Sequence, residues 1–257
     1  MIQVQDIVKS FEGNVVLNHV STEMRDGEVN MIIGQSGSGK TVLMKCMIGL
    51  HPLDSGQILY DGRDLAEMRS NDIRLLHREV GMLFQGSALF DSMTVMENVL
   101  FPMEMFSPKS REEMRERAEF CLRRVEMPER VWHLMPSEIS GGQQKRVAIA
   151  RAIALNPKYL FCDEPNSGLD PKTSLVIDDL ISSITHEYGM TTIINTHDMN
   201  SVLGIGESIL FSCDGHKEWE GSKDQIMGST NEKLNSFIFA SDLLRKVKEE
   251  EAQKEKL

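Results

Sequence analysis

The sequence predicts an α/β fold in which a mainly parallel sheet carries helices on both faces. A glycine-rich loop lies between a β-branched apolar run, residues 29–33, and a proline-free apolar segment, residues 42–50, that is typical of a helix. Strand-like and helix-like segments alternate again from residue 159 onward. Such alternation is typical of parallel strands joined by crossover helices, so we expect a sheet with both faces covered.

The N-terminal part of the chain precedes this pattern and is rich in strand-like runs. Turn residues at Glu12-Gly13-Asn14 and Asp26-Gly27 separate the first three runs. Short turns of this kind favour antiparallel neighbours, so we expect an antiparallel β portion at the N-terminus. Strands are expected at residues 2–8, 15–20, 29–33, 57–60 and 80–84.

The middle of the chain has a helical character. Thr94 and Ser110 are each followed three residues later by a glutamate, which is the pattern of a capping box at a helix N-terminus. Beyond this insert we expect strands at 159–164, 191–196 and 208–213, with helices at 171–188 and 198–206. The predicted organisation is a core in two parts, residues 1–85 and 156–228, a helical subdomain, 86–155, and a tail, 229–257.

Composition narrows the class of protein. The 257 residues include 40% hydrophobic and 26% charged side chains, which is enough apolar material for a large core. The formal net charge of −11 argues against a nucleic acid partner, because backbone phosphate binding relies on clustered lysine and arginine. Four scattered cysteines without CxxC spacing or a signal peptide lead us to expect a reducing cytosol, and no apolar run approaches the roughly 20 residues of a membrane span.

Residues 34–41 fit the phosphate-binding pattern G-x-x-x-x-G-K-[ST], with a strand predicted before them and a helix after them. Glycines allow successive N–H groups and the helix N-terminus to face one anion. Lys40 would reach the β and γ phosphates, and the Thr41 hydroxyl would hold Mg²⁺. The alternative is a Gly/Ser linker that matches by accident. The loop residues expected to bind nucleotide are Gly34, Gln35, Ser36, Gly37, Ser38, Gly39, Lys40 and Thr41.

Two carboxylates end the predicted strand at residues 159–164. Ligands of open α/β sheets bind at the carboxyl ends of the strands, so Asp163 and Glu164 are placed for chemistry. Successive strand side chains point to opposite faces, and the two acids can have different roles. We expect Asp163 to hold Mg²⁺ and Glu164 to polarise an attacking water. Taken alone, the pair could equally end a strand in solvent.

A second glycine pair, in Ile139-Ser140-Gly141-Gly142-Gln143, directly precedes a segment of good helix formers. Free N–H groups at a helix N-terminus favour an anion, so this is a candidate second anion site. Standing alone, the stretch would more simply be a surface turn.

Together these motifs resemble the ATP-binding cassette (ABC) ATPases, and the resemblance covers nearly all of residues 1–228. ISGGQ at 139–143 is similar to the family's LSGGQ signature, with isoleucine in place of leucine. The resemblance implies a P-loop NTPase fold with a RecA-like core, and ATP and Mg²⁺ as cofactors. It implies catalytic roles for Lys40, Gln85, Glu164 and His197, Mg²⁺ contacts from Thr41, Gln85 and Asp163, adenine stacking by Phe11, and nucleotide contacts from the D-loop residue Asp170.

The resemblance also implies that two copies of the chain act together. In the family, the signature of one subunit closes on the nucleotide held by the phosphate loop of the other. Ser140, Gly141, Gly142 and Gln143 would therefore bind ATP in the partner's site. Hydrolysis would then open this homodimer.

A transporter subunit is the expected type of ABC protein. The apolar stretch at residues 86–102 resembles the region in which the family docks an integral membrane permease. This implies peripheral attachment to the cytoplasmic face of the inner (plasma) membrane. An ABC protein that serves no transporter is the alternative.

The branch within the family is indicated by two short stretches. Lys40-Thr41-Val42-Leu43 and residues 90–102 resemble the ATPases of MCE/Mla-type phospholipid transport systems, which implies an MCE-type substrate-binding protein in the complex. Gln143 departs from that branch, where many members carry methionine. An importer of an amino acid or other small polar solute is therefore the alternative.

The tail combines a charge-balanced end with an apolar middle. Full burial of each large apolar side chain is worth roughly 1.5 to 3 kcal/mol, so we expect the apolar residues to dock on the body or on a partner. The end, KVKEEEAQKEKL, is expected to be a solvated helix or disordered. The apolar residues are Phe237, Ile238, Phe239, Leu243 and Leu244.

Overall fold

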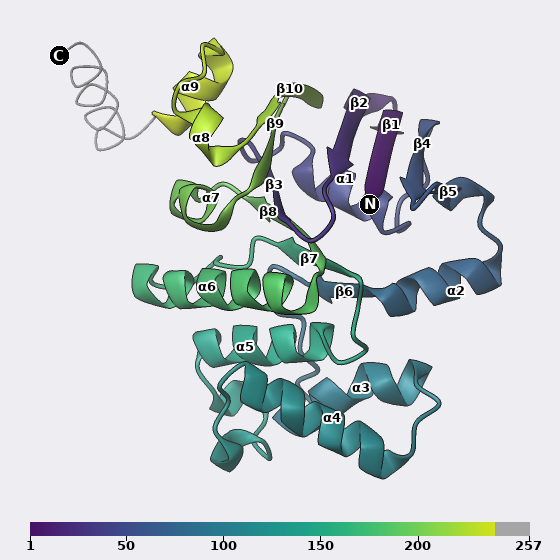
Figure 1. Cartoon of the computed structure of the whole chain (residues 1–257), viewed down its shortest axis with the longest axis vertical. Coiled ribbons are helices and arrows are strands. Elements are labelled where there is room, and N and C mark those ends of the chain that lie inside the picture. The colour runs from purple at the N-terminus through teal and green to yellow at the C-terminus, as the bar shows by residue number, and fades with distance from the viewer. Residues whose placement is uncertain (240–257) are drawn as a thin grey trace.

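The computed structural model describes residues 1–239, which form two β-sheets and a layer of helices (Figure 1). The first sheet has the order β2-β1-β4-β5 and is antiparallel, as the N-terminal sequence predicts. Side chains of β1 alternate between buried and less buried positions, the period-two pattern of a sheet with one covered face. Its strands are β1 (Ile2–Phe11), β2 (Asn14–Met24), β4 (Ser55–Tyr60) and β5 (Arg63–Asp64).

The second sheet has the order β10-β9-β3-β8-β7-β6 and is parallel except for β10 at its edge. Every residue of the central strands β3, β8 and β7 is buried, because helices cover both faces. The α/β class with a mainly parallel core is confirmed. The strands are β3 (Val29–Ile33), β6 (Val80–Leu83), β7 (Tyr159–Asp163), β8 (Thr191–Thr196), β9 (Ser208–Cys213) and β10 (His216–Gly221).

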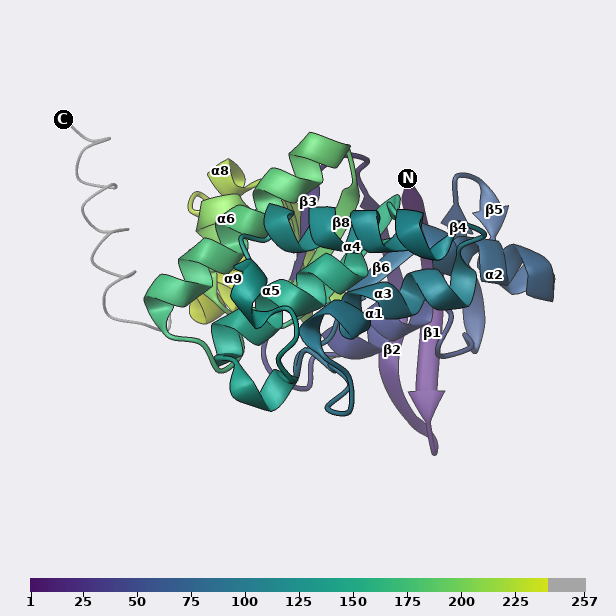
Figure 2. The same cartoon turned by 90° about the horizontal axis from the view of Figure 1, so that it is seen from below.

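Helices α3, α4 and α5 gather at one end of the molecule, and α6 lies between them and the strands (Figures 1 and 2). The Thr94–Glu97 and Ser110–Glu113 capping boxes form as predicted at the starts of α3 and α4. The helices are α1 (Lys40–Met47), α2 (Ser70–Glu79), α3 (Val95–Phe106), α4 (Arg111–Arg124), α5 (Gly141–Ala152), α6 (Pro171–Tyr188), α7 (Met199–Ile205), α8 (Lys223–Ile226) and α9 (Glu232–Ile238).

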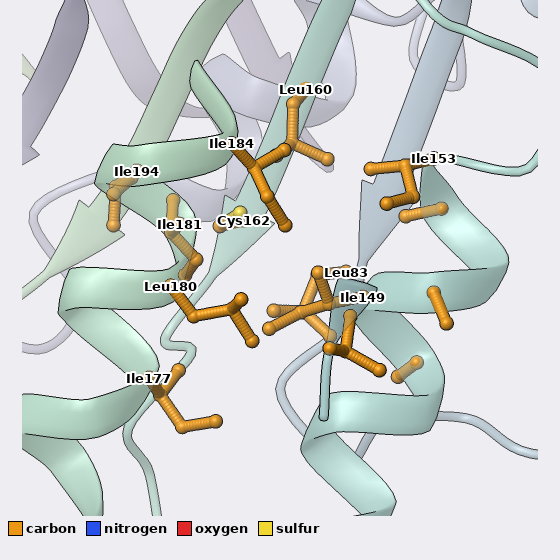
Figure 3. Packing of buried hydrophobic residues seen from close by; sticks show 14 of the residues in the cluster. Leu83, Ile149, Ile153, Leu160, Cys162, Ile177, Leu180, Ile181, Ile184 and Ile194 are labelled. Carbon is orange, nitrogen blue, oxygen red and sulfur yellow. The ribbon is translucent and has the colours of Figure 1, made fainter. Parts of the chain in front are cut away.

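Two hydrophobic clusters hold these layers together. One joins the parallel sheet to α5 and α6, where Ile149 of α5 lies beside Leu83 and the α6 residue Ile181 lies beside Cys162 (Figure 3). The other joins the opposite face of that sheet to α1 and the antiparallel sheet. Helix α1 is therefore packed between the two sheets, which fixes the direction of its N-terminus.

Apolar residues of the tail dock on the body, as expected, within the described part of the chain. Ile238 and Phe239 are buried, and the Phe237 ring lies 5.4 Å from the Phe211 ring of β9. Leu243, Leu244 and the charged end lie outside the described residues. Within residues 1–239, no helix combines the length and apolar character needed to span a bilayer.

Candidate nucleotide site

A cavity of about 410 Å³ opens at the carboxyl edge of the parallel sheet. The phosphate loop follows β3, Glu164 follows β7 and His197 follows β8, so neighbouring parallel strands deliver these residues to one edge. Residues predicted from four separate stretches of sequence are thus brought together, and Val16 of β2 adds a further wall. The lining residues are Val16, Ser36, Gly37, Gly39, Lys40, Thr41, Val42, Gln85, Glu164 and His197.

The phosphate loop has the shape of an anion cradle. A side chain at Gly34 is excluded because a Cβ there would lie 2.2 Å from the Ser212 carbonyl oxygen, and Gly39 has φ of +95° directly before α1. The N-terminus of α1 therefore opens toward the cavity, where its dipole favours negative charge. Ser38 Oγ is buried without a hydrogen-bond partner among the described residues, and a phosphate oxygen would satisfy it.

Lys40 provides the positive charge of the cradle. Its Nζ donates to the Gly34 and Gln35 carbonyl oxygens at 2.8 and 3.0 Å, which curls the side chain back over the loop. Burial lowers the pKa of the Lys40 ammonium, while the nearby Glu164 and Asp163 carboxylates oppose that shift. The loop, the helix end and this ammonium together fit a di- or triphosphate.

Oxygen ligands suited to Mg²⁺ meet next to Lys40. Thr41 Oγ1 donates to Asp163 Oδ1 at 3.2 Å, and Asn195 Nδ2 donates to the same oxygen at 3.2 Å. Gln85 lines the cavity from the other side, with its Nε2 donating to Ser167 Oγ at 3.3 Å. Hydroxyl, carboxylate and amide oxygens are the donors that Mg²⁺ prefers, so the residues present fit the metal.

Glu164 and His197 form a pair beside these candidate Mg²⁺ ligands. His197 Nδ1 lies 2.9 Å from Glu164 Oε1, and the Glu164 N–H donates to the Asn195 carbonyl oxygen at 3.0 Å. Glu164 has φ of +48°, an uncommon conformation for a non-glycine residue. This backbone turn carries the chain out of β7 while the Glu164 carboxylate remains in the lining of the cavity that the phosphate loop also lines.

Helix α5 holds the backbone that follows Gln85. Lys145 Nζ donates to the Gln85 carbonyl oxygen, and Arg151 donates to the Ser87 and Ala88 carbonyl oxygens at 2.8 and 2.7 Å. Burial lowers the pKa of both cations. Lys145 and Arg151 could not be predicted from the sequence, because nothing local marks a helix cation whose hydrogen-bond acceptor is a carbonyl some 60 residues earlier.

The signature residues lie away from this cavity in the single chain. Ser140 caps α5, with its Oγ accepting from the Gln143 N–H at 3.3 Å. Gly142 is packed closely, since a Cβ there would lie 2.8 Å from Thr173 Cγ2, whereas Gly141 has more space. These four residues do not line the cavity that holds the phosphate loop.

Asp170 and Phe11 also lie outside the cavity lining. Asp170 caps α6, accepting from the Lys172 and Thr173 N–H groups at 3.1 Å. The Phe11 ring lies 5.2 Å from the His51 ring in an edge-on contact at the tip of the β1–β2 hairpin.

A second, apolar groove of about 480 Å³ lies beside the segment held by α5. Phe90 is 39% exposed and its ring lies 4.6 Å from that of Phe101, whereas Val95 and Val99 are buried core residues. Within residues 86–102, therefore, some apolar side chains pack in the core, and others, such as Phe90, form an open wall of the groove. The groove is lined by His77, Val80, Gly81, Met82, Phe84, Ala88, Phe90, Phe101, Pro102, Phe106, Arg151, Ala152 and Leu155.

Comparisons with known proteins agree with this geometry. The family model described as "ABC transporter" matches residues 17–167. The methionine import ATP-binding protein MetN of Clostridium acetobutylicum is 37% identical over 94% of this chain and 75% of its own length. The MetN protein of Campylobacter jejuni is 35% identical over 95% of this chain and 77% of its own. These relatives are methionine importers, so they do not support the expected resemblance to Mla-type phospholipid ATPases.

Solved structures share the fold. An ATP-binding cassette solved as a dimer in a post-hydrolysis state with ADP and Pi has a TM-score of 0.79 and 33% identity, covering 87% of this chain and 99% of that one. The cbiO1 protein from Clostridium perfringens, part of the cbiONQ ABC transporter complex, has a TM-score of 0.81 and 28% identity over 91% of this chain and 94% of its own. The chain thus belongs to the ABC transporter family, as an ATP-binding subunit that hydrolyses ATP with Mg²⁺.

Proposed function

We propose that the chain powers an importer of an amino acid, with methionine as the first candidate. The observation that carries this proposal is the 37% identity with a methionine import ATPase, which extends over 94% of the chain rather than over the nucleotide motifs alone. An ATPase of this type does not touch the cargo, so the site itself does not select between cargoes. The proposal therefore rests on likeness along the whole chain.

In the proposed hydrolysis, Lys40 neutralises the β and γ phosphates, and Thr41, Asp163 and Gln85 hold the Mg²⁺ shell. The bound Mg²⁺ supplies charge neutralisation of the transferring phosphoryl group. These roles are supported by the position of Lys40, Thr41 and Gln85 in the lining of one cavity, and by the hydrogen bond that joins Asp163 to Thr41.

Glu164 is the proposed general base. Its carboxylate orients and deprotonates the attacking water, and His197 contacts the γ-phosphate while holding Glu164 through the 2.9 Å hydrogen bond. The pairing supports a role in which His197 holds the Glu164 carboxylate in place. A carboxylate that is already held by a hydrogen bond loses less conformational entropy when the water binds.

The second half of each site is proposed to come from another copy of the chain. Ser140, Gly141, Gly142 and Gln143 lie at the N-terminus of α5, outside the cavity of their own chain. In a homodimer they would approach the γ-phosphate across the interface, with Asp170 near the same boundary. Phe11 would exchange its contact with His51 for the adenine ring.

The apolar groove is proposed to receive a helix of an integral membrane permease. The exposed Phe90 ring and the half-buried Phe101 ring beside it would be covered by that helix, and Arg151 lines the groove with its guanidinium 5.9 Å from the Phe90 ring. This docking would place the chain at the cytoplasmic face of the inner membrane. The division into core (1–85 and 156–228), helical subdomain (86–155) and tail (229–257) fits this arrangement, with the groove along the boundary of the first two.

Phospholipid transport with an MCE-type substrate-binding protein is the second candidate. It is favoured by Lys40-Thr41-Val42-Leu43 and by residues 90–102, which line part of the docking groove. The identity along the remainder of the chain favours the amino acid importer.

The two candidates are separated by transport in a defined system. The tagged chain is purified with its permease from membranes, reconstituted in liposomes, and supplied with ATP and either radiolabelled methionine or a fluorescent phospholipid, with a Glu164→Gln complex as the inactive control. ATP-dependent methionine movement is expected. Lipid movement without methionine movement would replace the first candidate by the second, and the absence of any co-purifying permease would refute both.

A further inference from the structure

Asn195 is a buried amide at the centre of the sheet that the established chemistry does not use. It lies on β8, between β3, which leads into the phosphate loop, and β7, which ends at Asp163. Asn195 is paired in register with both Ile32 and Asp163. Asn195 is 1% exposed, and Ile193 on the same face of the strand is an apolar residue of the core. A polar side chain at such a position is therefore unusual.

The amide donates to the carboxylate expected to contact Mg²⁺. Its Nδ2 lies 3.2 Å from Asp163 Oδ1, the same oxygen that accepts from Thr41 Oγ1 at 3.2 Å. Reversing the amide would place its oxygen against this carboxylate, so the electrostatics select the donating orientation. The Thr41 hydroxyl and the Asn195 amide thus both donate to Oδ1 of Asp163. These two bonds limit rotation of the carboxylate about its Cβ–Cγ bond.

This donation leaves the amide incompletely satisfied. Asn195 Oδ1 is buried and has no hydrogen-bond partner among the described residues, and the Nδ2 contact with Met44 Sδ at 3.7 Å is weak. A buried polar atom without a partner is unfavourable, and an isosteric leucine at this position would remove that penalty. Packing therefore does not explain the amide, whereas the bond to Asp163 does.

We propose that Asn195 is a positioning residue for Mg²⁺, acting through Asp163: it donates to Oδ1 and holds the carboxylate in the orientation that the metal requires. The inference rests on the proposed metal role of Asp163. Partners that orient a ligating carboxylate typically change metal affinity by about 10- to 100-fold when removed. Asn195→Leu should therefore weaken Mg²⁺ binding to the nucleotide complex by roughly this factor while leaving the cradle for the phosphates intact.

The test measures metal binding directly. Purified full-length protein is titrated with ATP in EDTA by calorimetry, and the protein–ATP complex is titrated with Mn²⁺ followed by the electron paramagnetic resonance signal of the free ion. Asn195→Leu is compared with Thr192→Val, a matched change on the same strand that removes a buried hydrogen bond to Thr185 outside the site. Asn195→Ala replaces Asn195→Leu if circular dichroism shows that the leucine variant is unfolded.

We expect both Asn195→Leu and Asp163→Asn to bind Mn²⁺ more weakly than the unmodified chain. Asn195→Leu should keep its affinity for metal-free ATP. Thr192→Val should keep both its Mn²⁺ affinity and its ATP affinity. If Asp163→Asn weakens Mn²⁺ binding and Asn195→Leu behaves like Thr192→Val, the inference about Asn195 is overturned alone. If Asp163→Asn leaves Mn²⁺ binding unchanged, the metal role proposed for Asp163 fails and the inference fails with it.

Discussion

Replacing Glu164 by glutamine isolates the contribution of one carboxylate without disturbing its surroundings. Glutamine keeps one side-chain oxygen, which can still accept from His197 across the 2.9 Å contact. The backbone at this position has φ of +48° and its N–H donates to the Asn195 carbonyl oxygen, a bond that does not involve the side chain. The substitution therefore removes the charge and the basicity, and leaves the geometry of the turn in place.

The size of the effect follows from the role assigned to the carboxylate. A positioned general base contributes typically about 10²- to 10⁴-fold to a rate. At 1.36 kcal/mol for each tenfold change, this corresponds to about 2.7 to 5.4 kcal/mol of lost transition-state stabilisation. Lys40, Thr41 and Asp163 are untouched, so ATP affinity should stay close to that of the unmodified chain. Slow hydrolysis with retained binding should accumulate an ATP-bound dimer.

The assay measures phosphate release under single-turnover conditions, and light scattering during size-exclusion chromatography reports the dimer in ATP with Mg²⁺. Glu187→Gln is the matched control, because it makes the same change at an exposed carboxylate that pairs with Arg124 at 2.6 Å, away from the cavity. That control should hydrolyse ATP normally and should not trap a dimer. Turnover by Glu164→Gln within a few-fold of the unmodified rate would refute the assignment of Glu164 as the base.

Further predictions concern the cradle, the groove and a buried acid. Lys40→Ala should weaken ATP binding in calorimetry by roughly 10- to 100-fold, because a charge-assisted contact to phosphate is lost; unchanged affinity would remove Lys40 from the cradle. Phe90→Asp should prevent co-purification with the permease, since a carboxylate would replace an apolar contact of the groove, and should leave ATP binding unchanged because Phe90 does not line the nucleotide cavity. Thermal unfolding is measured alongside, because the ring also packs on Phe101: a collapse in stability would make Phe90 a packing residue, and a stable variant that still assembles would move the interface elsewhere. Burial raises the pKa of Asp178 to about 6 from 3.8. Ionisation of this carboxyl therefore lowers the free energy of unfolding of the protein, by up to about 3 kcal/mol, as the pH rises from about 4 to 6. In denaturant unfolding measured at several pH values, Asp178→Asn should lack this loss of stability, so its gain over the unmodified chain should be largest above pH 6. Identical pH profiles for the variant and the unmodified chain would contradict the raised pKa of Asp178.

The cavity was predictable from sequence because its chemistry lies at the ends of strongly apolar strands. The runs that end at Ile33, Asp163 and Thr196 are buried throughout, and parallel strands bring their carboxyl ends to one edge. The phosphate loop and the Asp163-Glu164 pair could therefore be expected at this edge from local pattern, whereas His197 was assigned only through the resemblance to the family.

Elements with little apolar content were not predicted. Within α2 only Leu76 is buried, and β10 is an edge strand of polar sequence, so neither element has the continuous apolar run that marks the central strands. The contact between Phe11 and His51 and the bond from Lys145 to Gln85 join residues far apart in sequence. Asn195 was missed for a related reason, since one polar residue in an apolar strand gives no local signal about the carboxylate on the neighbouring strand.

The three hydrogen bonds from α5 to residues 85–88 give this helix a mechanical property. Twelve residues form a rod about 18 Å long, with Ser140 at its N-terminal end and Arg151 near the other. Ser87 and Ala88 already hold left-handed backbone conformations, with φ of +62° and +47°, so the segment has little freedom to absorb a displacement by local bending. The segment at residues 85–88 is thus tied by three hydrogen bonds to the helix that carries Ser140 at its other end, so a ligand that ordered this segment would also order α5.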